Sequence, residues 1–313
     1  MQRRCFLAAL SASALTAPQL SHSQTSPPQG LTLGFSTYGA KTMKTERIID
    51  LLAKLGYDSL EITIWPGWDL DSAATSAQRR KTLRKQLQDR GLRLTSLMEH
   101  LHIDEKQRTA AQRIERVKRA AELAHDLSPQ HPPLLQTTLG GGGDWRKVRQ
   151  RYAEELQQWL KAADAGDLTI AVKPHRGGAF SRPSEAVELA KMLDHPQRLR
   201  MCYDFSHYDF RDMTLEETIR DALPHVAHIA VKDVIQEKTG RTRFVLPGEG
   251  GRIDYPKMLR LFYEGGYRGD VCSEVSGQVW SRPGYHPIKT AETCYDYLAA
   301  AFVKSRVPRK RRH

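Results

Sequence analysis

The chain has few cysteines and no long apolar run. Only 4 of its 313 residues are cysteine, and Cys202, Cys272 and Cys294 stand in segments that predict buried positions. A small secreted domain held together by disulfides uses cysteine far more densely, so that class is excluded. No segment after the N-terminus approaches the roughly 20 apolar residues of a membrane-spanning helix. We therefore expect no stable membrane insertion, and cysteines that serve as small buried side chains.

The N-terminal segment carries a pair of arginines before a short, weakly apolar stretch. Arg3 and Arg4 precede Cys-Phe-Leu, and residues 8–17 are rich in Ala and Ser. A basic start before a short apolar run is typical of a signal peptide, and paired arginines are typical of twin-arginine export. We expect residues 1–23 to be a signal peptide, 24–30 a flexible leader, and the protein to be exported to the periplasm. The alternative is a disordered basic N-terminus.

The net charge of +12 is concentrated at the two ends of the chain. Removing two basic residues of the predicted signal peptide and five of a C-terminal tail, placed at 304–313, leaves +5 on the rest of the chain. These residues are Arg3, Arg4, Arg306, Arg309, Lys310, Arg311 and Arg312. No zinc finger or helix-turn-helix pattern accompanies them. We expect a solvated basic tail and no nucleic-acid partner.

From residue 31 to residue 303, short apolar runs alternate with longer amphipathic ones. Eight such pairs without a linker predict a single (β/α)8 TIM barrel, an α/β fold, and a doubly wound sheet is the alternative. The predicted strands are 31–37, 59–65, 93–98, 134–138, 168–173, 199–204, 226–232 and 269–274. The predicted helices lie near 43–55, 75–90, 106–127, 144–165, 182–194, 214–222, 254–265 and 288–303.

Ionisable residues stand at the carboxyl ends of several predicted strands. Lys173 closes the fifth strand and Asp204 the sixth, with His207 three residues later, and Glu274 closes the eighth. A TIM barrel builds its active site at this end of the strands. The sequence therefore predicts an active site lined by these side chains.

Motifs in the last third of the chain occur together in one known family. Asp204-x-x-His207 is followed by Val231-Lys232-Asp233, then by Leu-Pro-Gly-Glu-Gly at 246–250 and by Gly-Tyr-Arg-Gly at 266–269 before Glu274. With these motifs the chain resembles the sugar phosphate isomerase/epimerase family of xylose isomerase-like TIM barrels, over about residues 31–303. The resemblance implies proton abstraction next to a carbonyl, through an enediolate, on a carbohydrate substrate.

Metal-dependent members of that family hold one divalent cation with four side chains from strands five to eight. Asp204 and Glu274 match two of these ligands, but Lys173 replaces the usual Glu and Ala230 replaces the usual His. We expect Lys173 itself to serve as the cation, so that no cofactor is needed. The alternative is one divalent metal ion held by a reduced set of ligands, Asp204, His207 and Glu274.

The resemblance also implies roles for individual residues. Glu274 or Asp204 is the candidate base, Lys173 stabilises the oxyanion, and His175 and His207 move protons. The candidate substrate-binding residues are Glu61, Trp65, His100, Lys232 and Arg243. Three of them have structural alternatives: Glu61 as a residue of the barrel interior paired with a lysine, Trp65 as a residue of loop packing, and Lys232 as an ion-pair partner of Asp233.

The expected reaction is isomerisation or epimerisation of a free sugar or keto-sugar, because an exported protein does not meet cytosolic sugar phosphates. The alternatives are a keto-glycoside or inosose-type lyase or dehydratase, and a non-catalytic sugar-binding accessory protein. DNA repair of the endonuclease IV type is disfavoured, because Ala230 and Phe244 stand where its zinc cluster needs ligands. The sequence leaves open whether the chain forms a homo-oligomer.

Overall fold

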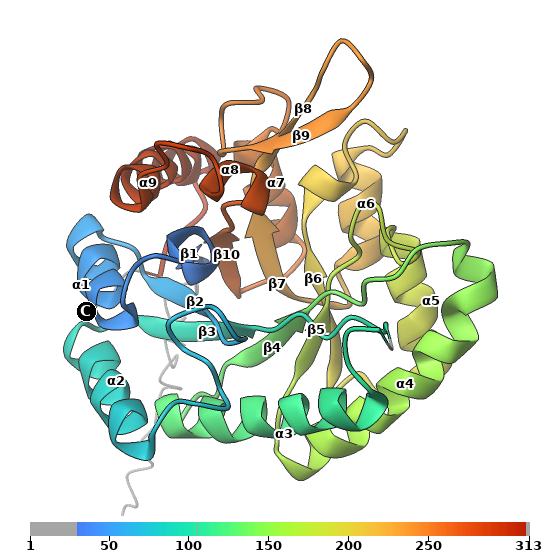
Figure 1. Ribbon diagram of the computed structural model, residues 1–313. Helices are drawn as coiled ribbons and strands as arrows, with labels where there is room; N and C mark the ends of the chain where they lie inside the picture. Colours follow the sequence, from blue (N-terminus) through green and yellow to red (C-terminus); the bar gives the residue numbers. More distant parts are fainter. Residues whose placement is uncertain (1–29, 105, 311–313) are drawn as a thin grey trace, which may run out of the picture.

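Eight parallel strands close into a barrel in the computed structural model, which describes residues 30–104 and 106–310 (Figure 1). The strand order around the barrel is β1-β10-β7-β6-β5-β4-β3-β2, and each neighbouring pair is parallel. The predicted (β/α)8 TIM barrel is thereby confirmed. The barrel strands are β1 (Thr32–Ser36), β2 (Ser59–Thr63), β3 (Arg93–Met98), β4 (Leu134–Thr137), β5 (Ile170–Val172), β6 (Leu199–Tyr203), β7 (Val226–Val231) and β10 (Asp270–Ser273).

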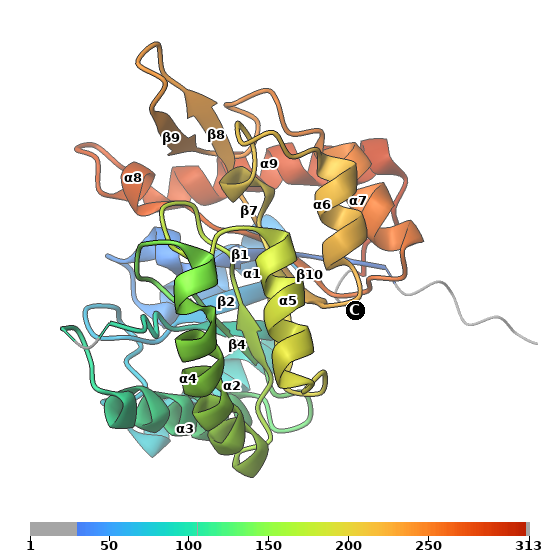
Figure 2. The same ribbon diagram turned by 90° about the vertical axis from the view of Figure 1, so that its right-hand side faces the viewer.

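Helices surround the barrel and pack their apolar faces on its outer surface (Figures 1 and 2). Local interactions set the helix ends. Helix α3 starts at a capping box formed by Thr109 and Gln112. Helix α1 ends before Gly56, whose φ of 93° favours glycine. The long helices are α1 (Thr45–Leu55), α2 (Ala77–Asp89), α3 (Ala110–Leu127), α4 (Trp145–Ala165), α5 (Pro183–Leu193), α6 (Leu215–Ala222), α7 (Tyr255–Glu264) and α9 (Pro287–Ser305).

A hairpin that the sequence did not predict stands over the carboxyl end of the barrel strands. It consists of β8 (Asp233–Gln236) and β9 (Thr242–Val245), which pair antiparallel immediately after β7 (Figure 2). Three short helices follow strand ends: η1 (Thr37–Ala40), η2 (Phe205–His207) and α8 (Gly277–Trp280). These additions build the rim of the site.

The barrel interior contains small and polar side chains rather than large aliphatic ones. Ala171, Cys202 and Ala230 form a small buried cluster that is separate from the main core. Cys202, Cys272 and Cys294 are all buried and free, which confirms the prediction for the cysteines. Small interior residues leave room for longer charged side chains at the barrel mouth.

The C-terminal residues do not form the solvated tail that we predicted from residue 304. Helix α9 continues to Ser305, and the Lys310 N–H donates to the Leu31 carbonyl at 2.8 Å. Arg309 is paired with Asp58, with Nε 2.5 Å from Oδ2. Backbone pairing with the start of the first strand therefore holds this segment against the barrel. The signal peptide predicted over 1–23, and all of the leader predicted over 24–30 except Gly30, lie outside the described residues.

No helix among the described residues is both long enough and apolar enough to cross a bilayer.

Candidate active site

Four charged side chains meet at the carboxyl end of the barrel strands. Lys173, Asp204, Lys232 and Glu274 each follow directly after a strand, namely β5, β6, β7 and β10. All four side chains are buried, and their residues are 0–6% exposed. We call this set the charge ring. Consecutive strands of a closed barrel bring their ends together, which explains why residues a hundred positions apart come into contact.

The two ammonium groups of the charge ring alternate with its two carboxylates. Lys173 donates to Glu274, and Lys232 donates to Asp204. Lys232 Nζ also lies 3.0 Å from Glu274 Oε1, and Lys173 Nζ lies 3.9 Å from Asp204 Oδ2. The four formal charges sum to zero. The ring therefore satisfies its own buried charges, which would be costly if left unpaired.

The pKa values in the charge ring favour the charged forms. Burial alone would raise the pKa of Glu274, but Lys173 and Lys232 outweigh burial and hold that pKa well below 4.5. Burial alone would lower the pKa of Lys173, but chiefly Glu274 raises it above 10.5. Lys173 is therefore held in its charged form, and a neutral lysine acting as the base does not fit this geometry.

Asp204 and His207 are held in fixed positions by their neighbours. Asp204 Oδ1 accepts from the Ser206 hydroxyl at 2.6 Å and from the Ser206 N–H at 3.2 Å. His207 Nδ1 accepts from the Arg176 N–H at 3.1 Å, so the neutral ring carries its proton on Nε2, 3.4 Å from Asp204 Oδ2. Burial lowers the pKa of His207 to about 4. Nδ1 is thus hydrogen-bonded, whereas Nε2 faces Asp204 without a hydrogen bond of good length, so His207 lies where it can help to orient Asp204.

His175 differs from His207, although the two rings are in contact. The ring centroids are 4.1 Å apart, and residue His175 is partly exposed whereas His207 is buried. Burial, and next the nearby His207, lower the pKa of His175 well below 6.5. A neutral imidazole beside two ammonium groups can exchange a proton with substrate oxygens.

Aromatic side chains form one wall of the site. Trp65 stacks on His100 with centroids 4.3 Å apart, so the structure brings both of these predicted substrate-binding residues together. Tyr38, which the sequence did not single out, packs against Trp65, Trp68 and Trp280. Burial, and next the Glu274 carboxylate, raise the pKa of Tyr38 to about 12. Its position just after β1, at the strand end where barrel sites form, was the signal that could have identified it.

One of the predicted substrate-binding residues, on the hairpin, lies away from the site. Arg243 is on β9, where its Nε lies 3.3 Å from Glu237 Oε1. The next residue, Phe244, faces the site instead, packing on His207 and 5.2 Å from Lys232 Nζ. Side chains alternate between the two faces of a strand, so Phe244 in the site directs Arg243 away from it.

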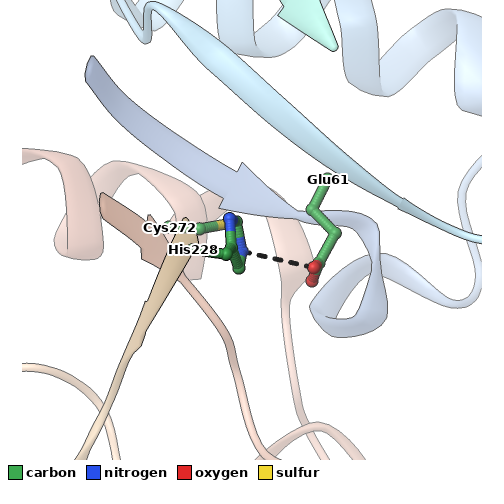
Figure 3. A group of neighbouring side chains, drawn as sticks. All are labelled: Glu61, His228 and Cys272. Atoms are coloured by element: carbon green, nitrogen blue, oxygen red, sulfur yellow. Dashed lines mark ion pairs between the residues drawn. The ribbon is translucent and has the colours of Figure 1, made fainter. Parts of the chain in front are cut away.

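Glu61 lies in the barrel interior, as the structural alternative proposed, but a histidine and not a lysine faces it. It accepts a hydrogen bond from the Ser96 hydroxyl at 2.8 Å, and its Oε2 lies 3.3 Å from His228 Nε2 (Figure 3).

The pairing of Lys232 with Asp233 that the sequence suggested as an alternative is not observed. Lys232 points into the charge ring, whereas Asp233 accepts from the Tyr255 hydroxyl at 2.6 Å.

A divalent cation does not fit the position that the family uses for its metal. The two carboxylates there, Asp204 and Glu274, are already bonded to ammonium groups, and His207 has no free lone pair. A metal would have to displace Lys173 and Lys232 into a low-dielectric interior without partners. The reduced ligand set considered from the sequence therefore does not form a metal site in this arrangement.

Comparisons with known proteins agree with the fold. Residues 49–300 match the family model of the xylose isomerase-like TIM barrel. L-ribulose-5-phosphate 3-epimerase UlaE of Escherichia coli K12 is 22% identical over 263 residues, covering 82% of this chain and 89% of that protein. An inosose dehydratase of Mesomycoplasma hyopneumoniae is 19% identical over 163 residues, covering 48% of this chain and 53% of that protein.

Solved structures show the same barrel at low sequence identity. The IOLI protein, solved with a bound zinc atom, superposes with a TM-score of 0.69 at 17% identity, covering 87% of this chain and 99% of that one. D-psicose 3-epimerase of Clostridium cellulolyticum H10, solved with D-tagatose, gives 0.66 at 19% identity, covering 88% and 98%. Because the family model spans most of the sequence, the chain belongs to the xylose isomerase-like TIM barrel family.

Proposed function

We propose that the protein is a sugar isomerase or epimerase that transfers a proton next to a carbonyl group through an enediolate. The observation that carries this proposal is the charge ring, which presents a carboxylate beside fixed cations at the barrel mouth. Enediolate chemistry needs a base for the carbon acid and a positive group for the oxyanion. The ring supplies both without a metal ion.

In the proposed reaction, a Glu274 oxygen takes the proton from the carbon next to the carbonyl. The electrons of that C–H bond form the carbon–carbon double bond, and the carbonyl oxygen becomes an oxyanion bonded to the Lys173 ammonium. Protonation of the same carbon on the opposite face by a second acid gives epimerisation, after which Glu274 loses its proton to solvent. Return of the Glu274 proton to the neighbouring carbon gives isomerisation. His175 can exchange a proton between the two enediolate oxygens, because its ring is neutral.

The low pKa of Glu274 in the free protein is compatible with a role as base. Lys173 and Lys232 depress this pKa by bonding the carboxylate. A substrate carbonyl that accepts the Lys173 hydrogen bond takes one of these partners away from Glu274. The carboxylate then becomes more basic at the moment when the proton must be removed.

The expected substrates are free sugars and keto-sugars. Aromatic faces such as that of Trp65 suit the apolar face of a sugar ring, and they line the same site as the charge ring.

Elimination is the second candidate reaction, because an enediolate can also expel a hydroxyl group from the next carbon. Elimination gives a product that is lighter than the substrate by one water, whereas isomerisation and epimerisation leave the mass unchanged. A protein that only binds sugar gives no product.

Proton exchange in deuterated water tests the proposed function directly. Incubation with a panel of ketoses, aldoses and keto-sugars should place deuterium at the carbon next to the carbonyl of one of them, as read by mass spectrometry. Because the cation is a lysine, the exchange rate should stay within about twofold after dialysis against a chelator. Loss of exchange that added Mn²⁺ restores would contradict the metal-free reaction. No exchange with any sugar would contradict catalysis.

We also propose that the protein is exported through the twin-arginine route, which would explain a preference for sugars without phosphate. Replacing Arg3 and Arg4 together with lysine should keep the precursor in the cytoplasm, because that route reads the paired guanidinium groups. Cell fractionation and immunoblotting measure this, and Arg311→Lys with Arg312→Lys is the matched control at the other end of the chain. Unchanged export of the Arg3 and Arg4 variant would refute the proposal.

A further inference from the structure

A second group of reactive side chains lies in the barrel interior. Glu61 on β2, His228 on β7 and Cys272 on β10 face one another (Figure 3). One ligand atom of each lies within 4.8 Å of the others, and the residues are 0–1% exposed. We call them the interior triad. His228 stands two residues before Ala230 and faces the same side of β7, so the triad lies about 6–7 Å deeper than the family's metal position.

The His228 ring has no hydrogen-bond partner on either nitrogen, although it is buried. A buried imidazole normally satisfies at least one nitrogen, because an unpaired polar group in the interior destabilises the fold. Nε2 points toward Glu61 Oε2 at 3.3 Å, which is longer than a good hydrogen bond. It is, however, about the separation expected for a nitrogen and an oxygen that share a tetrahedral zinc ion at roughly 2.0–2.1 Å each.

The chemistry of the triad matches zinc rather than a hard cation. Thiolate, imidazole and carboxylate are the three ligand types that bind Zn²⁺ in proteins, whereas Mg²⁺ and Ca²⁺ prefer oxygen alone. The Ser96 hydroxyl, which donates to Glu61 at 2.8 Å, would orient the carboxylate as an outer hydrogen bond does at known metal sites. Three protein ligands leave the fourth position for a water molecule.

The electrostatics of this layer also differ from those of the charge ring. The buried Asp270 carboxylate is close enough to the triad to act electrostatically on His228, and it accepts from the hydroxyls of Thr32 and Thr95 at 2.6 and 3.0 Å. Two carboxylates and a thiol surround one imidazole here, whereas two ammonium groups balance the carboxylates above. A cavity of about 420 Å³ at the opposite end of the barrel is lined by residues that include Asp270 and His228, which offers a route for an ion.

We propose that the interior triad binds one zinc ion, which ties strands β2, β7 and β10 together beneath the active site. Binding would deprotonate the Cys272 thiol, and the released proton would pass to the buffer. This site is independent of the proposed reaction, whose groups all lie in the layer above. It would place a metal one layer deeper than the position where Lys173 and Ala230 replace two family ligands.

Cobalt absorption tests the site, because Co²⁺ substitutes for Zn²⁺ and a bound thiolate gives a charge-transfer band in the near ultraviolet. The full chain, reduced and stripped of metal, should bind one Co²⁺ with this band and lose the band when Zn²⁺ is added. Cys272→Ser should abolish the band. The matched control is Cys202→Ser, which removes a buried interior thiol from the neighbouring strand β6 and should leave the band unchanged.

A variant with Cys272 as its only cysteine keeps the test decisive if Cys272→Ser does not fold. Replacing Cys5, Cys202 and Cys294 together with serine should preserve the band. Absence of a thiolate band in the wild-type chain, or its loss from this variant when circular dichroism shows a folded protein, would overturn the proposal. Deuterium exchange into sugars is a separate measurement, so failure of the zinc site and failure of the proposed function are distinguishable.

Discussion

Replacing Lys173 with methionine is expected to lower kcat by about 10²–10³-fold, the loss typical of removing one group that stabilises an oxyanion. Methionine keeps the length of the side chain but removes the ammonium group that bonds Glu274. Lys232 remains 3.0 Å from Glu274, so the carboxylate keeps a partner and the barrel should still fold. Steady-state kinetics on the sugar identified by deuterium exchange measures the effect.

The control for this variant is Lys161→Met, which alters an exposed lysine on the outer side of α4 and should leave kcat unchanged.

The pH profile of Lys173→Met separates a catalytic role of Lys173 from a structural one. Because Lys173 lowers the pKa of Glu274, its removal should raise that pKa and move the acidic limb of any residual activity to higher pH. Full activity in Lys173→Met would reduce the residue to a structural ion-pair partner.

Replacing Glu274 with glutamine is expected to lower the rate of deuterium exchange by about 10²–10⁴-fold, the range for loss of a positioned general base. The amide has the same shape but cannot accept a proton from carbon. Lys232 keeps its bond to Asp204, so one buried ion pair survives. Sugar binding, measured by calorimetry, should change much less than exchange, because both ammonium groups remain available to substrate oxygens.

Glu264→Gln, at the exposed end of α7, is the matched control for the Glu274 variant. Asp204→Asn provides a second comparison, since Ser206 and Lys232 already occupy the Asp204 oxygens in the free protein. If exchange disappears in Asp204→Asn but persists in Glu274→Gln, Asp204 is the base and the assignment is wrong. Wild-type exchange rates in both variants would argue against either carboxylate as the base.

The barrel was predictable because its pattern is local and repeated eight times. Helix caps and apolar periodicity placed most elements to within a few residues, and strand ends identified the active-site side. The β8–β9 hairpin was missed, since two strands of four residues directly after β7 carry little periodicity of their own. The C-terminal tail was mistaken for a solvated one, because a run of basic residues does not reveal a distant buried partner such as Asp58.

Individual side chains in the site were harder to predict because alternation along a strand fixes only relative directions. Arg243 and Phe244 necessarily face opposite sides, but the packing of the hairpin on the barrel decides which one faces the site. Lys232 stands two residues after Ala230, so the two side chains lie on the same face of the strand. This spacing was a signal that Lys232 points into the barrel and not toward Asp233. The family resemblance indicated Lys173 as the only cation in place of the metal. In the structure, Lys173 bonds Glu274 and Lys232 bonds Asp204.

The sequence by itself determined the barrel, because its pattern of strands and helices repeats along the chain. The resemblance of its motifs to a known family implied the family and the replacement of two metal ligands by Lys173 and Ala230. Only the tertiary structure decided how the charges are paired. Closure of the barrel brings Lys232 between Asp204 and Glu274 and sets Glu61, His228 and Cys272 together one layer below. Such contacts depend on strand register and barrel closure, which join residues far apart in sequence to within a few ångströms.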